Sequence, residues 1–215
     1  MPIFFQQDID ETTKLGIWKI EEQETFFLQK VVPQRNVSHP HKKLQHLAGR
    51  YLLKFLYPDF PIELIRIADT RKPFLEDEAY HFSISHCSDY AAVIVSKTER
   101  VGIDIELITP KVERIMNKFL NEEEKKMLDG EQVSKSNKQL VVKNQQLTLM
   151  WCCKEAVYKW WSYGSVDFSE KIRLMPFQTK ASGSLAAWFF SPQKAFDLTI
   201  HFKTIDELCL AWLKT

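Results

Sequence analysis

Residues 147–161 are apolar on nearly every side of a helix, and this run limits the possible folds more than any other part of the sequence. A helix with no polar face is buried in the core of a domain rather than laid on its surface. The run nevertheless contains three charged residues, Lys154, Glu155 and Lys159. Burying an unpaired charge costs several kcal/mol, so each of these residues needs a partner or a charged ligand.

Apolar and polar residues alternate from 101 to 107, which predicts a strand with one face in the core. Asp104 and Glu106 then project from the same face with Cα atoms about 7 Å apart, at a rise of about 3.3 Å per residue. Two carboxylates this close repel each other unless water or a cation separates them. A hard divalent ion such as Mg²⁺ suits such a pair, and Gly102 on the same face leaves room for a ligand. A polar strand face in water is the alternative interpretation.

The charges within 147–161 also allow two interpretations. Glu155 and Lys159 are four residues apart, so they can form a helix ion pair worth about 0.2–0.5 kcal/mol. That interpretation offers no partner for Lys154. In the second interpretation, Glu155 completes a three-carboxylate magnesium site with Asp104 and Glu106, and both lysines face phosphate oxygens. We favour the second interpretation because it accounts for all three charges.

The remaining patterns predict an α+β fold with largely antiparallel sheets. Helices are expected at residues 22–31, 42–56, 111–119 and 147–161. Strands are expected at residues 62–68, 80–86, 90–96 and 101–107, and over most of 172–214. Asn121, with Glu124 three residues later, has the pattern of a helix-capping box. Residues 129–146 are polar and poor in aromatic side chains, so we expect a surface loop there.

Composition and charge exclude several classes of protein. The 215 residues carry a formal net charge of +1, which gives no overall attraction to nucleic acid or to a membrane surface. No run approaches the roughly 18 apolar residues of a membrane span, and the first residues lack the pattern of a signal peptide. The four cysteines suit neither a disulfide framework nor a zinc site. We therefore expect a cytoplasmic protein that binds neither nucleic acid nor membrane.

Two motifs taken together resemble a known family. GIDIE at 102–106 and WCCKEAVYK at 151–159 resemble the paired signature of the 4′-phosphopantetheinyl transferases. Further similar segments are LAGRYLL at 47–53, KP at 72–73 and FSISH at 82–86. The sequence departs from the family pattern at Cys152, where Ser or Thr is usual, and at Arg71, where Gly is usual.

The chain length resembles that of the surfactin-synthetase type, which is a monomer. This resemblance implies a pseudo-two-fold α+β fold of two similar halves, each with a mostly antiparallel sheet packed on helices. The first half, residues 1–100, would grip coenzyme A, and the second half, residues 101–215, would hold the metal. The implied reaction transfers the 4′-phosphopantetheine of coenzyme A to a serine of an apo acyl or peptidyl carrier protein and releases 3′,5′-ADP.

The resemblance also implies a role for individual residues. Asp104, Glu106 and Glu155 would bind Mg²⁺, with Mn²⁺ as a possible substitute. The catalytic residues would be Glu155, as general base, with Lys159 and Lys154. Coenzyme A would contact Lys43, Arg50, Lys72, Pro73, Ser85, His86, Lys154 and Lys159. Separately from the resemblance, the charge of Lys135, Lys138 and Lys143 in the expected loop suggests that they contribute to binding an acidic carrier protein.

Two other functions use the same residues. Acidic residues with a lysine also serve magnesium-dependent nucleases and phosphodiesterases. Against this, no basic stripe for a nucleic-acid backbone is present in the sequence. The second alternative is a module that binds coenzyme A without catalysis. It would not require the five charged residues of the two motifs, all of which are present here.

Overall fold

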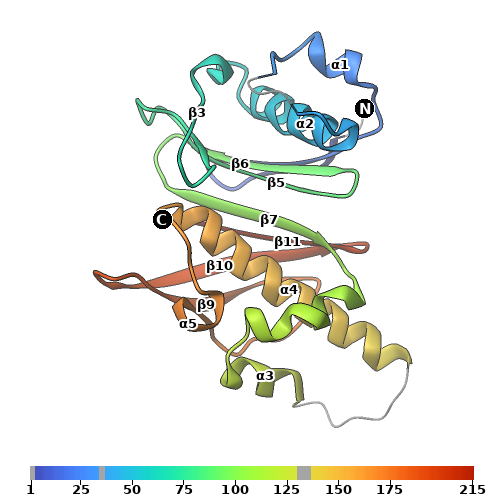
Figure 1. Cartoon of the computed structure of the whole chain (residues 1–215), viewed down its shortest axis with the longest axis vertical. Coiled ribbons are helices and arrows are strands. Elements are labelled where there is room, and N and C mark those ends of the chain that lie inside the picture. Colours follow the sequence, from blue (N-terminus) through green and yellow to red (C-terminus); the bar gives the residue numbers. More distant parts are fainter. Residues whose placement is uncertain (1–2, 34–36, 130–136) are drawn as a thin grey trace. The chain divides into compact units, whose positions relative to one another are not determined.

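The computed structural model describes residues 3–33, 37–129 and 137–215. The chain divides between Ile103 and Asp104 into two compact units, and each unit places helices on an antiparallel sheet (Figure 1). The α+β class expected from the sequence is confirmed, whereas the pseudo-two-fold relation between the halves stays a prediction. Within the described residues, no helix combines the length and the apolar character that crossing a membrane requires.

The first unit is built on a four-stranded sheet with the order β1-β2-β6-β5. Its strands are β1 (Ile3–Asp8), β2 (Thr13–Lys19), β6 (Tyr90–Ser96) and β5 (His81–Cys87). All three pairings are antiparallel. The strands expected at 80–86 and 90–96 are confirmed, whereas the sequence patterns gave no prediction for β1 and β2.

Helix α2 (Pro40–Leu56) covers this sheet. It begins with proline in its first turn, where no N–H is needed, and His39 accepts a hydrogen bond from the backbone N–H of Lys42. Leu47 and Leu52 are fully buried on its apolar face. Gly49 permits a close approach to β5, because a Cβ there would lie 2.9 Å from the side chain of Ile84.

The rest of the first unit consists of short elements. They are the helix α1 (Glu24–Leu28), the 3₁₀ turn η1 (Ile62–Leu64) and the two-residue strands β3 (Arg66–Ile67) and β4 (Pro73–Phe74). The strand expected at 62–68 is therefore largely wrong. Pro61 precedes η1 and its ring fixes φ, so the chain turns here before β3 begins.

The second unit has a five-stranded sheet with the order β7-β11-β10-β9-β8. Its strands are β7 (Val101–Leu107), β11 (Leu208–Lys214), β10 (Ala195–Ile205), β9 (Ser182–Phe190) and β8 (Ile172–Leu174). Strand β7 starts in the first unit and enters the second at Asp104. Helix α4 (Asn137–Trp161) lies across one face of this sheet (Figure 1). Its apolar side chains form the core with Ala211, Leu213 and other residues of the sheet.

Shorter helices surround α4. They are the 3₁₀ helix η2 (Pro110–Lys118), α3 (Glu122–Asp129) and α5 (Phe168–Lys171). The capping box before α3 is confirmed: the backbone N–H of Glu124 donates to Asn121 Oδ1, and the N–H of Asn121 donates to Glu124 Oε2, both at 2.9 Å. Glu124 is fully buried, which a capping residue at the surface would not be.

The loop expected at 129–146 is wrong from residue 137 onward, because α4 already begins at Asn137. Polar composition misled the prediction. Among the described side chains of α4, Val141 and Val142 are exposed, whereas the apolar residues from Leu147 onward enter the core. Lys143 belongs to this helix and pairs with Glu113 at 2.8 Å. Lys135 and the side chain of Lys138 lie outside the described residues.

Candidate active site

One stripe of α4 faces the carboxylates of β7. Trp151, Glu155 and Lys159 are spaced by four residues, so they follow each other along one side of the helix at about 6 Å intervals. Trp151 Nε1 donates to Glu106 Oε1 at 3.1 Å, and Lys159 Nζ donates to Asp104 Oδ1 at 2.5 Å. The helix therefore runs opposite to β7 here, and both carboxylates project toward α4 as the strand alternation predicts.

Glu155 occupies the turn between these two contacts. Burial raises the pKa of Glu155 to about 7, and repulsion by Asp104 and Glu106 acts in the same direction against the attraction of Lys159. The three carboxylates thus share one electrostatic environment. A carboxyl group with such a pKa can hold or release a proton near neutral pH.

Lys159 and Asp104 form an ion pair in this stripe. The carboxylate side chain is only 3% exposed, whereas the lysine side chain is 25% exposed. Burial alone would lower the pKa of Lys159, but attraction to Asp104 and then to Glu155 raises it above the ordinary value. The ammonium group therefore stays charged and offsets part of the negative charge of the site.

Cys152 of α4 contacts the backbone of β7. Its thiol donates to the backbone carbonyl oxygen of Asp104 at 3.2 Å. Burial and the nearby Asp104 raise the pKa of Cys152 well above the usual value, so the sulfur keeps its proton. A serine or threonine hydroxyl could donate the same hydrogen bond, which explains in physical terms how a cysteine is tolerated at this position.

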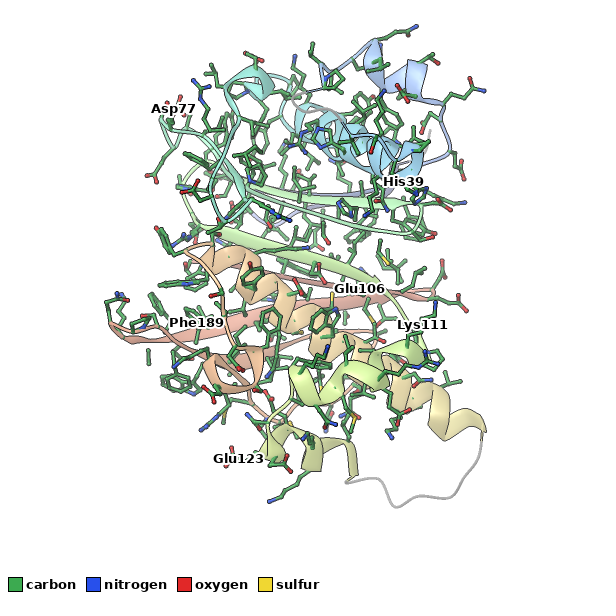
Figure 2. All side chains as sticks on the ribbon, viewed as in Figure 1. His39, Asp77, Glu106, Lys111, Glu123 and Phe189 are labelled. Carbon is green, nitrogen blue, oxygen red and sulfur yellow. The ribbon has the colours of Figure 1, made fainter. Side chains whose placement is uncertain are left out.

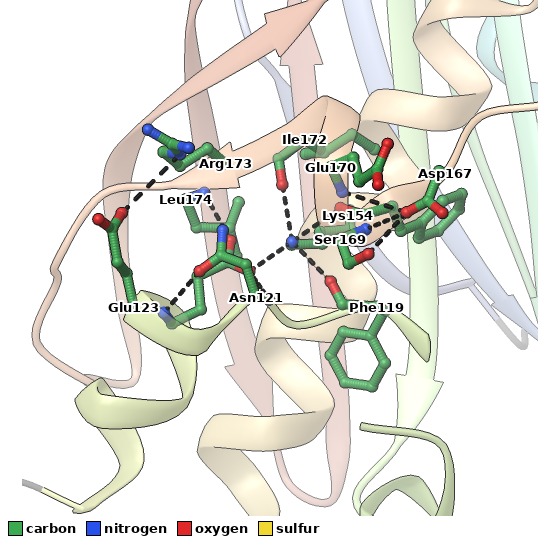
Figure 3. Close-up of polar contacts among 12 residues, drawn as sticks. Phe119, Asn121, Glu123, Lys154, Asp167, Ser169, Glu170, Ile172, Arg173 and Leu174 are labelled. Carbon is green, nitrogen blue, oxygen red and sulfur yellow. Dashed lines mark hydrogen bonds and ion pairs between the residues drawn. The ribbon is translucent and has the colours of Figure 1, made fainter. Parts of the chain in front are cut away.

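Lys154 lies elsewhere, contrary to the expectation that it faces phosphate. Its side chain is fully buried, and its Nζ donates to Glu124 Oε2 at 2.6 Å (Figure 3). The same atom lies within hydrogen-bond distance of the carbonyl oxygens of Phe119 (2.7 Å), Phe168 (3.0 Å) and Ile172 (2.7 Å). Three N–H bonds thus face four oxygens, and the burial lowers the pKa of Lys154 although Glu124 opposes this.

The Lys154–Glu124 pair closes the open edge of the sheet. Strand β8 is the last strand, and an edge strand leaves N–H and C=O groups without a neighbouring strand. Here the carbonyl oxygen of Ile172 accepts from Lys154, and the N–H of Leu174 donates to Glu124 Oε1 at 2.8 Å. The ion pair takes the place of a sixth strand at these two residues.

The carboxylates of Asp104, Glu106 and Glu155 suit a divalent cation, although their side chains are not yet arranged as a complete coordination site. Among residues 3–33, 37–129 and 137–215, no group of three His, Cys, Asp or Glu side chains is arranged to hold a metal ion. The chemistry of Asp104, Glu106 and Glu155 nevertheless fits Mg²⁺, which prefers carboxylate oxygens. Burial raises the pKa of Glu155 most, and the charges of Asp104 and Glu106 raise it further; a cation would neutralise this second contribution.

The expected coenzyme A residues of the first unit lie on α2 and β5. Lys43 pairs with Glu24 at 2.5 Å, and its side chain is partly exposed. Arg50 and Ser85 are buried, whereas His86 is exposed at the end of β5. A buried arginine on α2 is unexpected for a residue that the helix pattern allows on the surface.

Lys72 and Pro73 form the turn into β4. Burial lowers the pKa of Lys72 to about 7, and repulsion by Arg100 contributes. Arg71, at the position where the family usually has glycine, has a φ of 66°. This left-handed conformation is free for glycine and costs other residues about 1–2 kcal/mol. The turn keeps the shape that glycine favours.

Comparison with known proteins identifies the family. A family model described as the 4′-phosphopantetheinyl transferase superfamily matches residues 100–212, more than half of the chain. The chain belongs to the 4′-phosphopantetheinyl transferase superfamily. Asp104, Glu106 and the entire 151–159 motif lie within the matched range.

Two relatives of this superfamily member show how much of its sequence is similar to known proteins. Enterobactin synthase component D of Salmonella austin is 29% identical over 166 residues, which cover 76% of this chain and 65% of the relative. A putative 4′-phosphopantetheinyl transferase of Haemophilus influenzae (strain ATCC 51907 / DSM 11121 / KW20 / Rd) is 28% identical over 179 residues, covering 80% and 68%. The chain thus spans about two thirds of the length of both relatives.

The sequence of this superfamily member left two contacts unassigned, one in the site and one at the edge of β8. Trp151 holds Glu106 through its indole N–H, and Glu124 holds Lys154. The four-residue spacing from Trp151 to Glu155 could have indicated the first. The second had no local signal, because Glu124 and Lys154 are 30 residues apart.

Proposed function

We propose that this chain transfers the 4′-phosphopantetheine arm of coenzyme A to a serine hydroxyl of an acyl or peptidyl carrier protein. In this reaction the serine oxygen forms a bond to the β-phosphorus of the pyrophosphate, and the bond from that phosphorus to the bridging oxygen breaks. The serine proton passes to a base, and 3′,5′-ADP leaves. The observation that carries the proposal is the α4 stripe, which sets Glu155 and Lys159 against the two carboxylates of β7.

Glu155 is the proposed proton acceptor. Without a bound cation, burial and the neighbouring carboxylates raise the pKa of Glu155 to about 7. A divalent cation would lower this pKa, so Glu155 would be ionised and ready to accept the proton, directly or through a water molecule. Lys159 is the proposed cationic contact of the pyrophosphate. Its side chain pairs with Asp104 and is 25% exposed. Because the ammonium group is partly exposed, it can also offset charge that develops on phosphate oxygens.

Asp104, Glu106 and Glu155 are the proposed ligands of Mg²⁺, or of Mn²⁺ in its place. When bound, such an ion supplies Lewis-acid stabilisation of the pyrophosphate oxygens. Trp151 and Lys159 hold Glu106 and Asp104 by hydrogen bonds, which orients these carboxylates. Lys154 is left out of the proposed phosphate contacts because its Nζ is enclosed by protein oxygens.

The proposed coenzyme A contacts in the first unit are Lys43, Arg50, Lys72, Pro73, Ser85 and His86. Cationic side chains suit the phosphates of this donor. Lys72 can gain a proton when an anion binds, since burial holds its pKa near 7. We further propose that the chain is of the surfactin-synthetase type and acts as a monomer, in keeping with its two compact units. Because coenzyme A is its donor, we propose that the reaction takes place in the cytoplasm.

Intact-mass spectrometry of a carrier protein tests the proposal. The chain is incubated with coenzyme A, Mg²⁺ and an apo carrier protein, and the carrier is expected to gain one phosphopantetheine unit while 3′,5′-ADP accumulates. EDTA should stop the reaction, and Mg²⁺ or Mn²⁺ should restore it.

Matched variants connect the activity to the site. Asp104→Asn and Glu155→Gln keep the size of the side chain and should lower kcat at least about 100-fold. Glu113→Gln is the control, because it removes a carboxylate that pairs with Lys143 at the surface. A carrier of unchanged mass, or full activity in Asp104→Asn, would contradict the proposed function.

A further inference from the structure

The thiol of Cys152 lies between α4 and the two neighbouring strands β7 and β11. Cys152 is fully buried, and its Sγ is 3.2 Å from the carbonyl oxygen of Asp104 on β7 and 3.6 Å from that of Cys209 on β11. Lys159, two turns further along α4, holds the carboxylate of the same Asp104. Helix α4 therefore holds Asp104 at two points, its backbone oxygen and its side chain.

The side of α4 around this thiol consists of small side chains. Thr148, Cys152 and Ala156 follow one another at intervals of four residues, and none is more than 1% exposed. Short side chains let a helix pack close to a sheet, and in a close-packed interior a change of a single atom is felt by the neighbours. The size of the atom at Cys152 therefore affects the separation of α4 from β7.

Sulfur holds the two elements further apart than oxygen would. The S···O distance of 3.2 Å exceeds the usual O–H···O distance by about 0.4–0.5 Å, and a carbon–sulfur bond is itself longer than a carbon–oxygen bond. The thiol can also lie against both carbonyl oxygens at once. A serine or threonine hydroxyl, usual in the family at this position, would bring β7 closer to α4 to form the same hydrogen bond.

The separation of α4 from β7 is also the separation within the proposed metal site. Asp104 and Glu106 are on β7, where Glu106 is labelled in Figure 2. Glu155 is on α4, three residues after Cys152, so the two side chains are neighbours on the helix surface. Mg²⁺ requires oxygen ligands at about 2.0–2.1 Å in a nearly regular octahedron, whereas Ca²⁺ accepts about 2.3–2.6 Å and less regular geometry. These differences are as large as the difference between a thiol and a hydroxyl contact.

We propose that Cys152 is a positioning residue that shifts the metal preference of this chain from Mg²⁺ toward larger divalent ions, Mn²⁺ first. The inference rests on the proposed function, in which Asp104, Glu106 and Glu155 bind the cation. Cys152 does not touch the ion but acts through the backbone of Asp104. Mn²⁺ uses the same carboxylate ligands as Mg²⁺ and is the larger ion. Groups that orient metal ligands change metal affinity by about 10–100-fold.

Electron paramagnetic resonance of Mn²⁺ tests the proposal without catalysis. The full chain is titrated with Mn²⁺ in the presence of coenzyme A and without a carrier protein, and Mn²⁺ bound by coenzyme A alone is subtracted. Mg²⁺ or Ca²⁺ is then added to displace the bound Mn²⁺. In Cys152→Ser and Cys152→Thr, the ratio of the Kd for Mg²⁺ to the Kd for Mn²⁺ should fall about 10-fold, and Ca²⁺ should displace Mn²⁺ less readily than in the unmodified chain.

Cys153→Ser is the matched control. It makes the same chemical change in a neighbouring cysteine that is also fully buried. The side chain of Cys153 lies about 100° further round the helix, so it turns away from the Asp104 carbonyl. The Tm of Cys153→Ser, followed by calorimetry, reports the effect of a hydroxyl in the core, while the ratio of the two Kd values should stay unchanged. Cys152→Thr fills more of the space of the thiol and provides the measurement if Cys152→Ser does not fold.

Two results would overturn the role of Cys152 alone. They are an unchanged ratio in both Cys152 variants and an equal change of the ratio in Cys153→Ser. If the unmodified chain bound no Mn²⁺, or if Asp104→Asn bound it equally well, the proposed metal ligands would be wrong together with the role of Cys152. The mass of the carrier protein after incubation then shows independently whether the chain transfers phosphopantetheine.

Discussion

Replacing Lys154 by methionine removes the ammonium group from the interior of the second unit and leaves a side chain of similar length. Glu124, which is fully buried, would lose its ionic partner, and the carbonyl oxygens of Phe119 and Ile172 would lose a donor. Removing one partner of a buried pair costs about 3–5 kcal/mol. For a protein of this size, about 2–4 °C per kcal/mol converts this to a fall in Tm of roughly 6–20 °C.

Replacing both partners of the pair gives a second signature. With Lys154→Met alone, the carboxylate of Glu124 stays buried without its ionic partner. Adding Glu124→Gln removes the buried charge and should recover part of the loss.

Differential scanning calorimetry and the transfer assay together separate a structural lysine from a catalytic one. Below its Tm, Lys154→Met should retain kcat within a few-fold. Lys159→Met, whose side chain is 25% exposed, should lose activity with a smaller change in Tm. If Lys154→Met instead kept its Tm within about 2 °C and lost activity, the assignment of Lys154 to the sheet edge would be refuted.

Three further predictions concern the site and its surroundings. Because burial raises the pKa of Glu155 to about 7, the metal-free chain should lose stability as the pH rises from about 4.5 through 7, and Glu155→Gln should raise Tm at pH 8 but not at pH 4. A lower Tm of Glu155→Gln than of the unmodified chain at pH 8 would contradict this prediction. Burial and Arg100 lower the pKa of Lys72 to about 7, so stability should rise with pH from 7 to 10, and melts of Lys72→Met should lack this slope. Trp151→Phe removes the donor to Glu106 and should raise the Mg²⁺ concentration for half-maximal activity several-fold, and an unchanged requirement would show that the indole N–H does not orient this carboxylate.

Most of the helices and strands that the sequence predicted correctly were predicted from local sequence patterns. The alternation of residues 101–107 predicted β7 and the common face of Asp104 and Glu106, because side chains of a strand alternate whatever the rest of the fold. The capping box of Asn121 and Glu124 was equally local. By contrast, the beginning of α4 at Asn137 escaped prediction, since a polar helix at the edge of a domain has the composition of a loop.

The sequence by itself determined which charged residues had to be explained. The charges of the apolar helix and the alternating strand drew attention to Glu155, Lys159, Asp104 and Glu106, and the family resemblance of the two motifs assigned their roles. Only the tertiary structure decided where each charge goes. Lys154 and Glu155 are neighbours in the sequence but lie about 100° apart around the helix, so one turns to the edge of β8 and the other to β7. That choice depends on which segments pack on each side of α4, and no pattern within the helix contains it.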